Sequence, residues 1–346
     1  MTIMSPDLSG ADELPVIRLR TPSDLVAAAP YLVGYTIPDH SLVIFGLNDA
    51  GQVRVSVCGE IPASGTGHAE MAQSLRMKLT HVDVTAIYVL AYGDHAETTL
   101  LLDVVCTELA DHDIGVRDAL RIHGGRYWFH PDTDPDGGPS AGIPLDDGDV
   151  AAQAIAAGCA PFPSRSAVAA SIAPVAGDAR AAMRAATVVA EELLIDADTV
   201  DPEHVGRDLL RASYRFLPYA ADRYAAGGVI DDVQAALLAI ALQSVPVRDQ
   251  AISLSAHSDT RAYLALWTDL ARRVEPAYRV PVLCLLAFTA WRDGGGPLAT
   301  IAITEALRAD PGYRLAQLID QALACGLPGP AFDIPEPAGL PDEPGS

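Results

Sequence analysis

Apolar residues in the first third of the chain alternate between short continuous runs and helix-spaced stripes. The run Ala86 to Asp94 reads Ala-Ile-Tyr-Val-Leu-Ala-Tyr-Gly-Asp and ends in a turn signal. It is too short for a helix, so it predicts a strand that is buried on both faces. Helical patterns precede it at 67–80 and follow it at 97–110. This order predicts an α/β layer in which the strand is innermost.

Two hairpins complete the predicted sheet. The first joins residues 41–47, which are apolar on both faces and therefore central, to residues 53–58, which alternate and suit an edge. The second joins residues 116–122 to 126–129 around a Gly-Gly turn. The N-terminal domain, residues 15–130, is thus expected to be α/β, with a mixed sheet of four or five strands and helices against it. The first helix is predicted from Thr21 as N-cap to about Val33.

The second half of the chain is predicted to be all-helical. From residue 151 to 327 the apolar spacing is helical and no strand is predicted. The expected helices are 179–194, 202–216, 230–244, 260–273, 280–292, 297–309 and 313–325. Residues 131–150 are rich in aspartate and proline and predict an exposed acidic linker. Residues 1–14 and 328–346 have no periodic pattern and predict disordered ends.

One helix pair near the C-terminus has the spacing of a tetratricopeptide-type hairpin. Small and apolar residues occupy the packed positions of both helices, and Asp310-Pro311 ends the second helix. A single hairpin cannot bury its own face, so it must pack on neighbouring helices. Generic helix packing explains the same pattern equally well, and that alternative stays open. The matching residues are Leu286, Ala287, Ala290, Ala299, Ile303, Ala306 and Pro311.

Composition narrows the class of protein. The formal net charge of −22 disfavours direct binding to nucleic acid. The 5 cysteines are dispersed without a CxxC pair, which predicts buried thiols in a reducing compartment instead of disulfides or a thiolate metal site. No segment has the length and apolarity of a signal peptide or a membrane span. We therefore expect a cytoplasmic protein.

Most motifs that could carry chemistry have a simpler explanation. Asp132, Asp134, Asp136 and Gly137 copy the start of a calcium loop, but Ile143 stands where a bidentate glutamate is needed, so a solvated acidic linker is favoured. His68-Ala69-Glu70 matches part of the zinc deaminase signature without its PCxxC partner. No nucleophile, phosphate-loop or metal motif is complete. We predict no catalytic residue, no metal and no cofactor.

Two features remain as candidate sites. Gly93, Asp94 and His95 lie where the innermost strand ends and a helix begins, the usual position for ligands in open α/β sheets; Asp94 serves equally as a helix N-cap. Arg207, Arg211 and Arg215 lie four residues apart on one predicted helix, near Tyr214 and Tyr219. Pairing with the chain's own carboxylates or with the seam between the domains is the favoured explanation of this second feature, and the sharper hypothesis is a surface for an anionic ligand or an acidic partner segment.

Several short strings together resemble the actinobacterial domain of unknown function 4192. The resemblance spans Val16 to Pro328 and implies a cytosolic actinobacterial protein, without implying any activity. The strings are Leu19 to Leu25, Pro30 to Tyr35, Ser41 to Val43, Gly125 to Trp128, Pro163 to Arg165 and the hairpin from Gly296 to Gly312.

Two functional hypotheses follow. The first is a non-catalytic interaction or regulatory protein that binds a protein partner through the helical domain. The alternative is a small-molecule or nucleotide-handling α/β protein, a class that includes enzymes, with its site at Gly93 to His95. The sequence fixes neither the partner nor the oligomeric state.

Overall fold

The computed structural model describes residues 2–3, 17–51, 53–80, 82, 84–131, 141–146, 148–156, 160–200, 205–327, 329 and 333–337. The chain divides into two compact units. The first contains Met1–Ala167 with Ala322–Pro328, and the second contains Val168–Gln321 with Gly329–Ser346.

The first unit contains a six-stranded mixed sheet with the order β4-β3-β5-β6-β7-β8. β5 is antiparallel to β3 and parallel to β6, and the other neighbours are antiparallel. All but the first residue of β5 is buried, which confirms the predicted innermost strand. The strands are β3 (Ser41–Leu47), β4 (Val53–Glu60), β5 (Ala86–Tyr92), β6 (Val116–His123), β7 (Arg126–Phe129) and β8 (Ile143–Pro144). Separately, β1 (Thr2–Ile3) pairs with β2 (Ile17–Arg18).

The predicted count of four or five strands was wrong because β8 escaped detection. β8 has only 2 residues, Ile143 and Pro144, and both are exposed. Two residues cannot show the alternation that identifies a strand. β8 is recognised only by its pairing with Arg126 and Tyr127 of β7.

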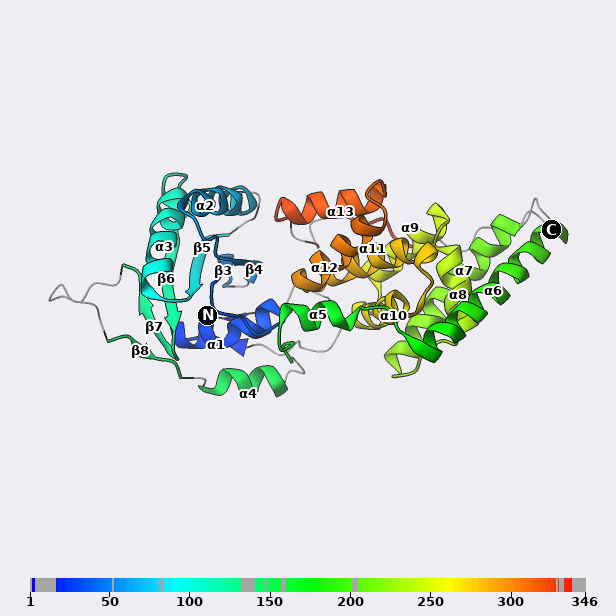
Figure 1. Ribbon diagram of the computed structural model, residues 1–346, viewed down its shortest axis with the longest axis horizontal. Helices are drawn as coiled ribbons and strands as arrows, with labels where there is room; N and C mark the ends of the chain where they lie inside the picture. Colours follow the sequence, from blue (N-terminus) through cyan, green and yellow to red (C-terminus); the bar gives the residue numbers. More distant parts are fainter. Residues whose placement is uncertain are drawn as a thin grey trace. The chain divides into compact units, whose positions relative to one another are not determined.

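Helices cover both faces of the sheet (Figure 1). α2 (Gly65–Thr80) and α3 (His95–Ala110) pack on one face, where Leu75, Leu101 and Val105 meet Ile44 and Val89. α1 (Pro22–Val33) lies on the other face and contacts β4, and α4 (Gly148–Ala156) packs against α1. The N-cap of α1 is Thr21, as predicted, and its hydroxyl and the Asp24 carboxylate form a capping box.

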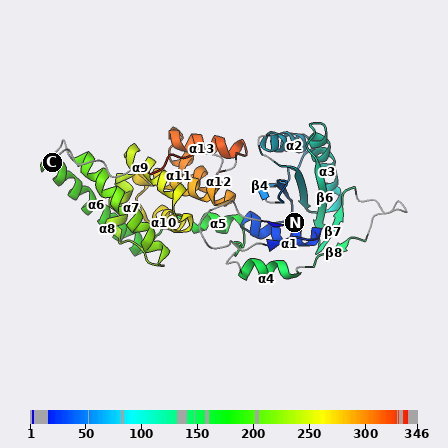
Figure 2. The same cartoon turned by 180° about the vertical axis from the view of Figure 1, so that it is seen from behind.

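The second unit is built around one buried helix. α11 is buried at eleven consecutive residues, Val280 to Ala290, and contacts α8, α9, α10 and α12. The view from behind shows α6 and α8 side by side (Figure 2). The helices are α6 (Gly177–Val200), α7 (Val205–Ala225), α8 (Asp232–Ala241), α9 (Val245–His257), α10 (Thr260–Arg273), α11 (Pro276–Arg292) and α12 (Gly296–Ala309). α5 (Arg165–Ser171) and α13 (Arg314–Ala324) each span a boundary between the two units.

The predicted hairpin at 280–309 corresponds to α11 and α12. The side chains that gave the tetratricopeptide spacing are buried in both helices, among them Leu286, Ala290, Ala299 and Ile303. The amide of Gly295 donates to the carbonyl of Ala290 at 2.7 Å and closes the turn. The two helices therefore pack on each other and on their neighbours.

The helical prediction missed three helices. α4 and α5 are short, and α9 begins with a proline in its first turn and buries polar residues, Gln250, Ser253 and Ser255. Such a face does not register as an apolar stripe. The predicted helix 230–244 is the shorter α8, followed directly by α9.

Some predictions fall outside the described residues. They concern Asp132, Asp134, Asp136 and Gly137, most of residues 1–14 and most of residues 328–346. Among the helices that the structure describes, none combines the length and apolarity needed to cross a membrane.

Candidate functional site

The first candidate site lies at the end of β5, where Asp94 acts as a helix cap. Its Oδ1 accepts the amide of Glu97 at 3.0 Å, and its carbonyl accepts the hydroxyl of Thr98 at 2.6 Å. The amide of Gly93 donates to Ile122 of β6 at 3.0 Å. The exposed His95 ring reaches the hydroxyl of Thr99 at 3.2 Å. The end of the strand thus passes into α3 through an N-cap formed by Asp94.

Two residues that the sequence did not single out complete this end of the sheet. His40 directly precedes β3, and its Nδ1 lies 2.6 Å from Oε2 of Glu97 in α3. The backbone fixes His40 in place, because its amide donates to Tyr92 at 2.8 Å and its carbonyl accepts from Ile61 at 2.7 Å. Its φ of 63° is left-handed, which is uncommon for a residue other than glycine.

The electrostatics of the pair favour a charged imidazole. The hydrogen bond to Glu97, and then the negative charge of the same carboxylate, raise the pKa of His40 above its ordinary value. A Cβ on Gly93 would lie 3.2 Å from Oε2 of Glu97, so the glycine gives the carboxylate room. A histidine held on a carboxylate beside a helix N-terminus can exchange a proton or attract an anion.

The second candidate site lies on α7. Arg207, Arg211 and Arg215 follow the helix at four-residue spacing, and Tyr219 continues it. Arg215 is exposed, Tyr219 is 48% exposed, and Arg211 and Tyr214 are half-buried. The ring of Tyr219 lies 5.7 Å from that of Phe216. The side chain of Arg207 lies outside the described part of the helix.

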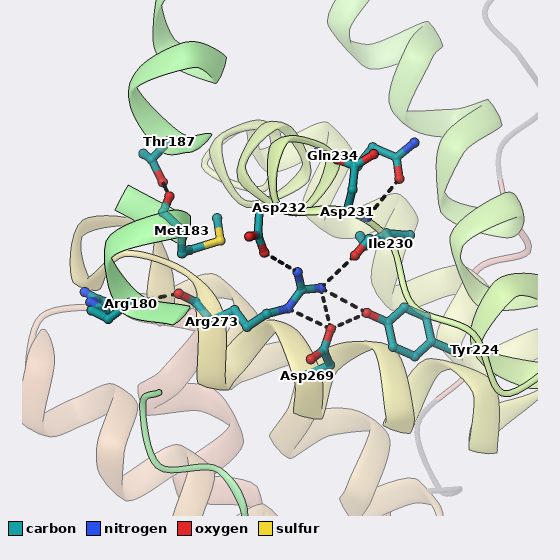
Figure 3. Close-up of polar contacts among 10 residues, drawn as sticks. All are labelled: Arg180, Met183, Thr187, Tyr224, Ile230, Asp231, Asp232, Gln234, Asp269 and Arg273. Atoms are coloured by element: carbon teal, nitrogen blue, oxygen red, sulfur yellow. Dashed lines mark hydrogen bonds and ion pairs between the residues drawn. The ribbon is translucent and has the colours of Figure 1, made fainter. Parts of the chain in front are cut away.

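A half-buried ion cluster holds the C-terminal end of α7 in place (Figure 3). The guanidinium of Arg273 in α10 reaches Asp232 at 2.8 Å, Asp269 at 2.5 Å and the hydroxyl of Tyr224 at 3.3 Å. It also donates to the carbonyl of Ile230 at 3.2 Å. These contacts join α7, the loop after it, α8 and α10.

The cluster is satisfied from within and is therefore structural. The hydroxyl of Tyr224 donates to Asp269, while burial and then this carboxylate raise the pKa of Tyr224. Burial lowers the pKa of Arg273, but the hydrogen bond and charge of Asp269 outweigh it and the net shift is upward. A guanidinium with carboxylates on both sides has little capacity left for a ligand.

A second arginine anchors the start of α6. Arg180 donates to the carbonyls of Arg273 and Val274 at 3.3 and 3.1 Å, and its Nη2 lies 3.1 Å from Glu275. It thereby caps the last turn of α10 with a cation, where the helix dipole favours one.

Other motifs from the sequence have structural roles. His68 is buried, and its Nε2 lies 2.9 Å from the carbonyl of Pro62. Asp231 caps α8, and Glu191 accepts the hydroxyl of Tyr278 at 2.6 Å. Within the described residues, no group of three or more His, Cys, Asp or Glu side chains is placed to hold a metal ion.

Comparison with known proteins identifies a family. The family model described as Domain of unknown function (DUF4192) matches residues 22–329. No curated protein and no solved structure matched the chain. Because the match covers most of the sequence and both compact units, the chain belongs to the DUF4192 family.

Proposed function

We propose that the protein is a non-catalytic interaction or regulatory protein whose helical unit holds an acidic partner segment on α7. The observation that carries this proposal is the stripe formed by Arg211, Arg215 and Tyr219, with Arg215 and Tyr219 exposed on a helix anchored by Arg273. We call residues Arg207, Arg211, Tyr214, Arg215 and Tyr219 the α7 stripe.

The chemistry of the α7 stripe suits protein recognition. Arginine and tyrosine are the side chains most enriched among the residues that dominate binding energy at interfaces. A carboxylate-bearing segment can accept the arginine donors and lie against the tyrosine ring. On a chain with a net charge of −22, a local group of cations also distinguishes this surface for an acidic segment.

The contacts that hold α7 against its neighbouring helices favour binding without a large rearrangement of the α7 stripe. The Arg273 cluster fixes the end of α7 relative to α8 and α10. A rigid surface loses less conformational entropy when a partner binds. The hairpin of α11 and α12, which we interpret as tetratricopeptide-like, would serve here as part of the scaffold. We place this function in the cytoplasm, where the free Cys58, Cys106, Cys284 and Cys325 would stay reduced.

A direct test uses a fluorescein-labelled poly-glutamate peptide and anisotropy. The full chain should bind it, and the double substitution Arg211→Gln and Arg215→Gln should weaken binding about three- to thirtyfold, since a solvent-exposed charged contact is worth up to about 1 kcal/mol. The matched control is Arg272→Gln with Arg314→Gln, two exposed arginines in other helices with the same change in charge. Equal loss in both double variants would contradict the proposal.

A second candidate function rests on the end of β5. His40 and Glu97 meet there beside Gly93, and the carboxylate raises the pKa of the imidazole. A charged imidazole next to a helix N-terminus is a candidate contact for an anionic group of a ligand. On this alternative, a small molecule or nucleotide binds at Gly93, Asp94 and His95.

A thermal-shift screen of nucleotides and metabolites separates the two functions. A compound that raises the melting temperature of the wild-type chain, but not that of Asp94→Ala measured against its own baseline, would support the β5 site. A screen without any stabilising compound, together with peptide binding that depends on the α7 stripe, would support the interaction protein.

A further inference from the structure

α6 carries two apolar faces and buries only one of them. Met183, Ala186, Thr187 and Ala190 are buried, and α6 packs on α8. On the remaining surface of the same helix four large apolar side chains are 43% to 61% exposed. They are Val188, Val189, Leu193 and Ile195. Exposed apolar side chains that cluster on one helix mark an interaction surface.

The charges on this surface are arranged symmetrically about Val188. Arg184 lies four residues before it and Glu192 four residues after it, so both share its face of the helix. Both are exposed, and neither forms an ion pair with another described residue. The exposed Ala181 and Ile195 lie seven residues to either side, again on the same face.

An antiparallel copy of α6 complements this pattern. If a two-fold axis passes beside Val188, Arg184 of one chain lies level with Glu192 of the other, and the ion pair forms twice. Ala181 likewise lies level with Ile195, so a small side chain meets a large one. A parallel copy in register would instead place like charges level with each other, which is unfavourable.

From this arrangement we infer that the chain self-associates as a two-fold symmetric pair through antiparallel α6 helices. The interface is isologous, with the same patch on both copies. Its centre is Val188, Ile195 lies on the same face about two turns further along, Val189 borders it, and its polarity is set by Arg184 and Glu192. The inference is independent of partner binding by the α7 stripe.

The overall charge limits the conditions under which the pair forms. Each chain carries a net charge of −22, so two copies repel each other at long range. At about 0.15 M salt the screening length is about 8 Å, and contacts within the interface then outweigh the distant repulsion. The experiment therefore belongs at physiological ionic strength.

Sedimentation equilibrium on the full chain tests the inference. The wild-type protein should show a reversible monomer–dimer equilibrium. Val188→Glu should raise its dissociation constant about tenfold or more, because it places two carboxylates at the centre of the interface. Leu100→Glu is the matched control, since Leu100 is an exposed apolar residue on a helix of the other unit, α3, and this variant should leave the equilibrium unchanged.

Charge reversal supplies the second measurement without touching the apolar residues. Arg184→Glu alone and Glu192→Arg alone should each weaken the pair, whereas the double variant should restore it towards the wild-type dissociation constant. A chain that stays monomeric at every concentration overturns the inference. So does a dimer that Val188→Glu leaves intact, or one in which the double variant is no tighter than the single ones.

Discussion

Nδ1 of His40 lies 2.6 Å from Oε2 of Glu97, which joins the residue before β3 to the first turn of α3 across 57 positions of sequence. The contact depends on the antiparallel pairing of β3 with β5, because the register opposes Ser41 to Tyr92 and so brings His40 beside Gly93. Sheet topology thus creates an ion pair next to the capped helix.

The pair makes stability depend on pH in a defined direction. The pKa of folded His40 is raised above its ordinary value of 6.5. A group whose pKa is higher in the folded state stabilises the fold fully below its unfolded pKa, and this stabilisation is lost as the pH rises through the folded pKa. His40→Gln should therefore reduce the free energy of unfolding more at pH 6 than at pH 9.

Urea unfolding at the two pH values measures this difference, with Glu97→Gln expected to reproduce it. An NMR titration of the His40 ring should also show a midpoint above that of an unfolded peptide. If His40→Gln lowers the free energy of unfolding by the same amount at both pH values, the His40–Glu97 pair does not contribute to stability in solution.

The Arg273 cluster predicts a large loss from a single substitution. Arg273→Met leaves Asp232 and Asp269 without their cation. The cluster is only half-buried and the Asp232 side chain is 38% exposed, so solvent screens part of the loss and the expected cost is about 1 to 3 kcal/mol. Arg272→Met, at the neighbouring exposed position, should change the free energy of unfolding by less than about 0.5 kcal/mol. Urea unfolding of both variants makes the comparison, and similar losses would show that the cluster is not a determinant of stability.

Alanine substitutions at two glycines allow the cost of backbone strain to be measured separately from the cost of steric crowding. Gly142 and Gly124 both have left-handed φ values, 71° and 55°. A Cβ on Gly142 would lie 2.3 Å from Cε2 of Trp128, whereas one on Gly124 would meet nothing within 4 Å. Alanine at either position should cost about 1 to 2 kcal/mol from strain. Gly142→Ala should cost about 1 to 3 kcal/mol more, because the ring must move.

Thermal or urea unfolding of the two alanine variants measures that excess. Equal losses would mean that Trp128 moves aside without cost, and that β8 is not held closely against the ring.

The elements that the sequence predicts well are those with strong local patterns. The apolar run at 86–92, the hairpin at 41–58 and the Thr21 cap each carry a short-range signal that tertiary packing does not override. β8 and α9 lack such a signal: β8 is too short to alternate, and α9 buries serine and glutamine instead of a continuous apolar stripe.

The site residues divide in the same way. Asp94 is recognisable as a cap because it immediately precedes a helix. The role of His40 cannot be recognised from the sequence, because its partner Glu97 is brought to it by the pairing of β3 with β5, which lie far apart in the chain. The exposed face of α6 does leave a signal, since Val188, Val189, Leu193, Leu194 and Ile195 occupy more than one side of a helix. A helix with apolar residues on two sides is expected to pack against a second surface besides its own core.

Hydrogen–deuterium exchange of the full chain with and without a glutamate-rich peptide tests the central claim most directly. The account predicts slower exchange over residues 211–219 of α7 when the peptide is bound, and no such change in the variant with Arg211→Gln and Arg215→Gln. Unchanged exchange over 211–219 in the wild-type complex, or equal protection in that variant, would contradict it.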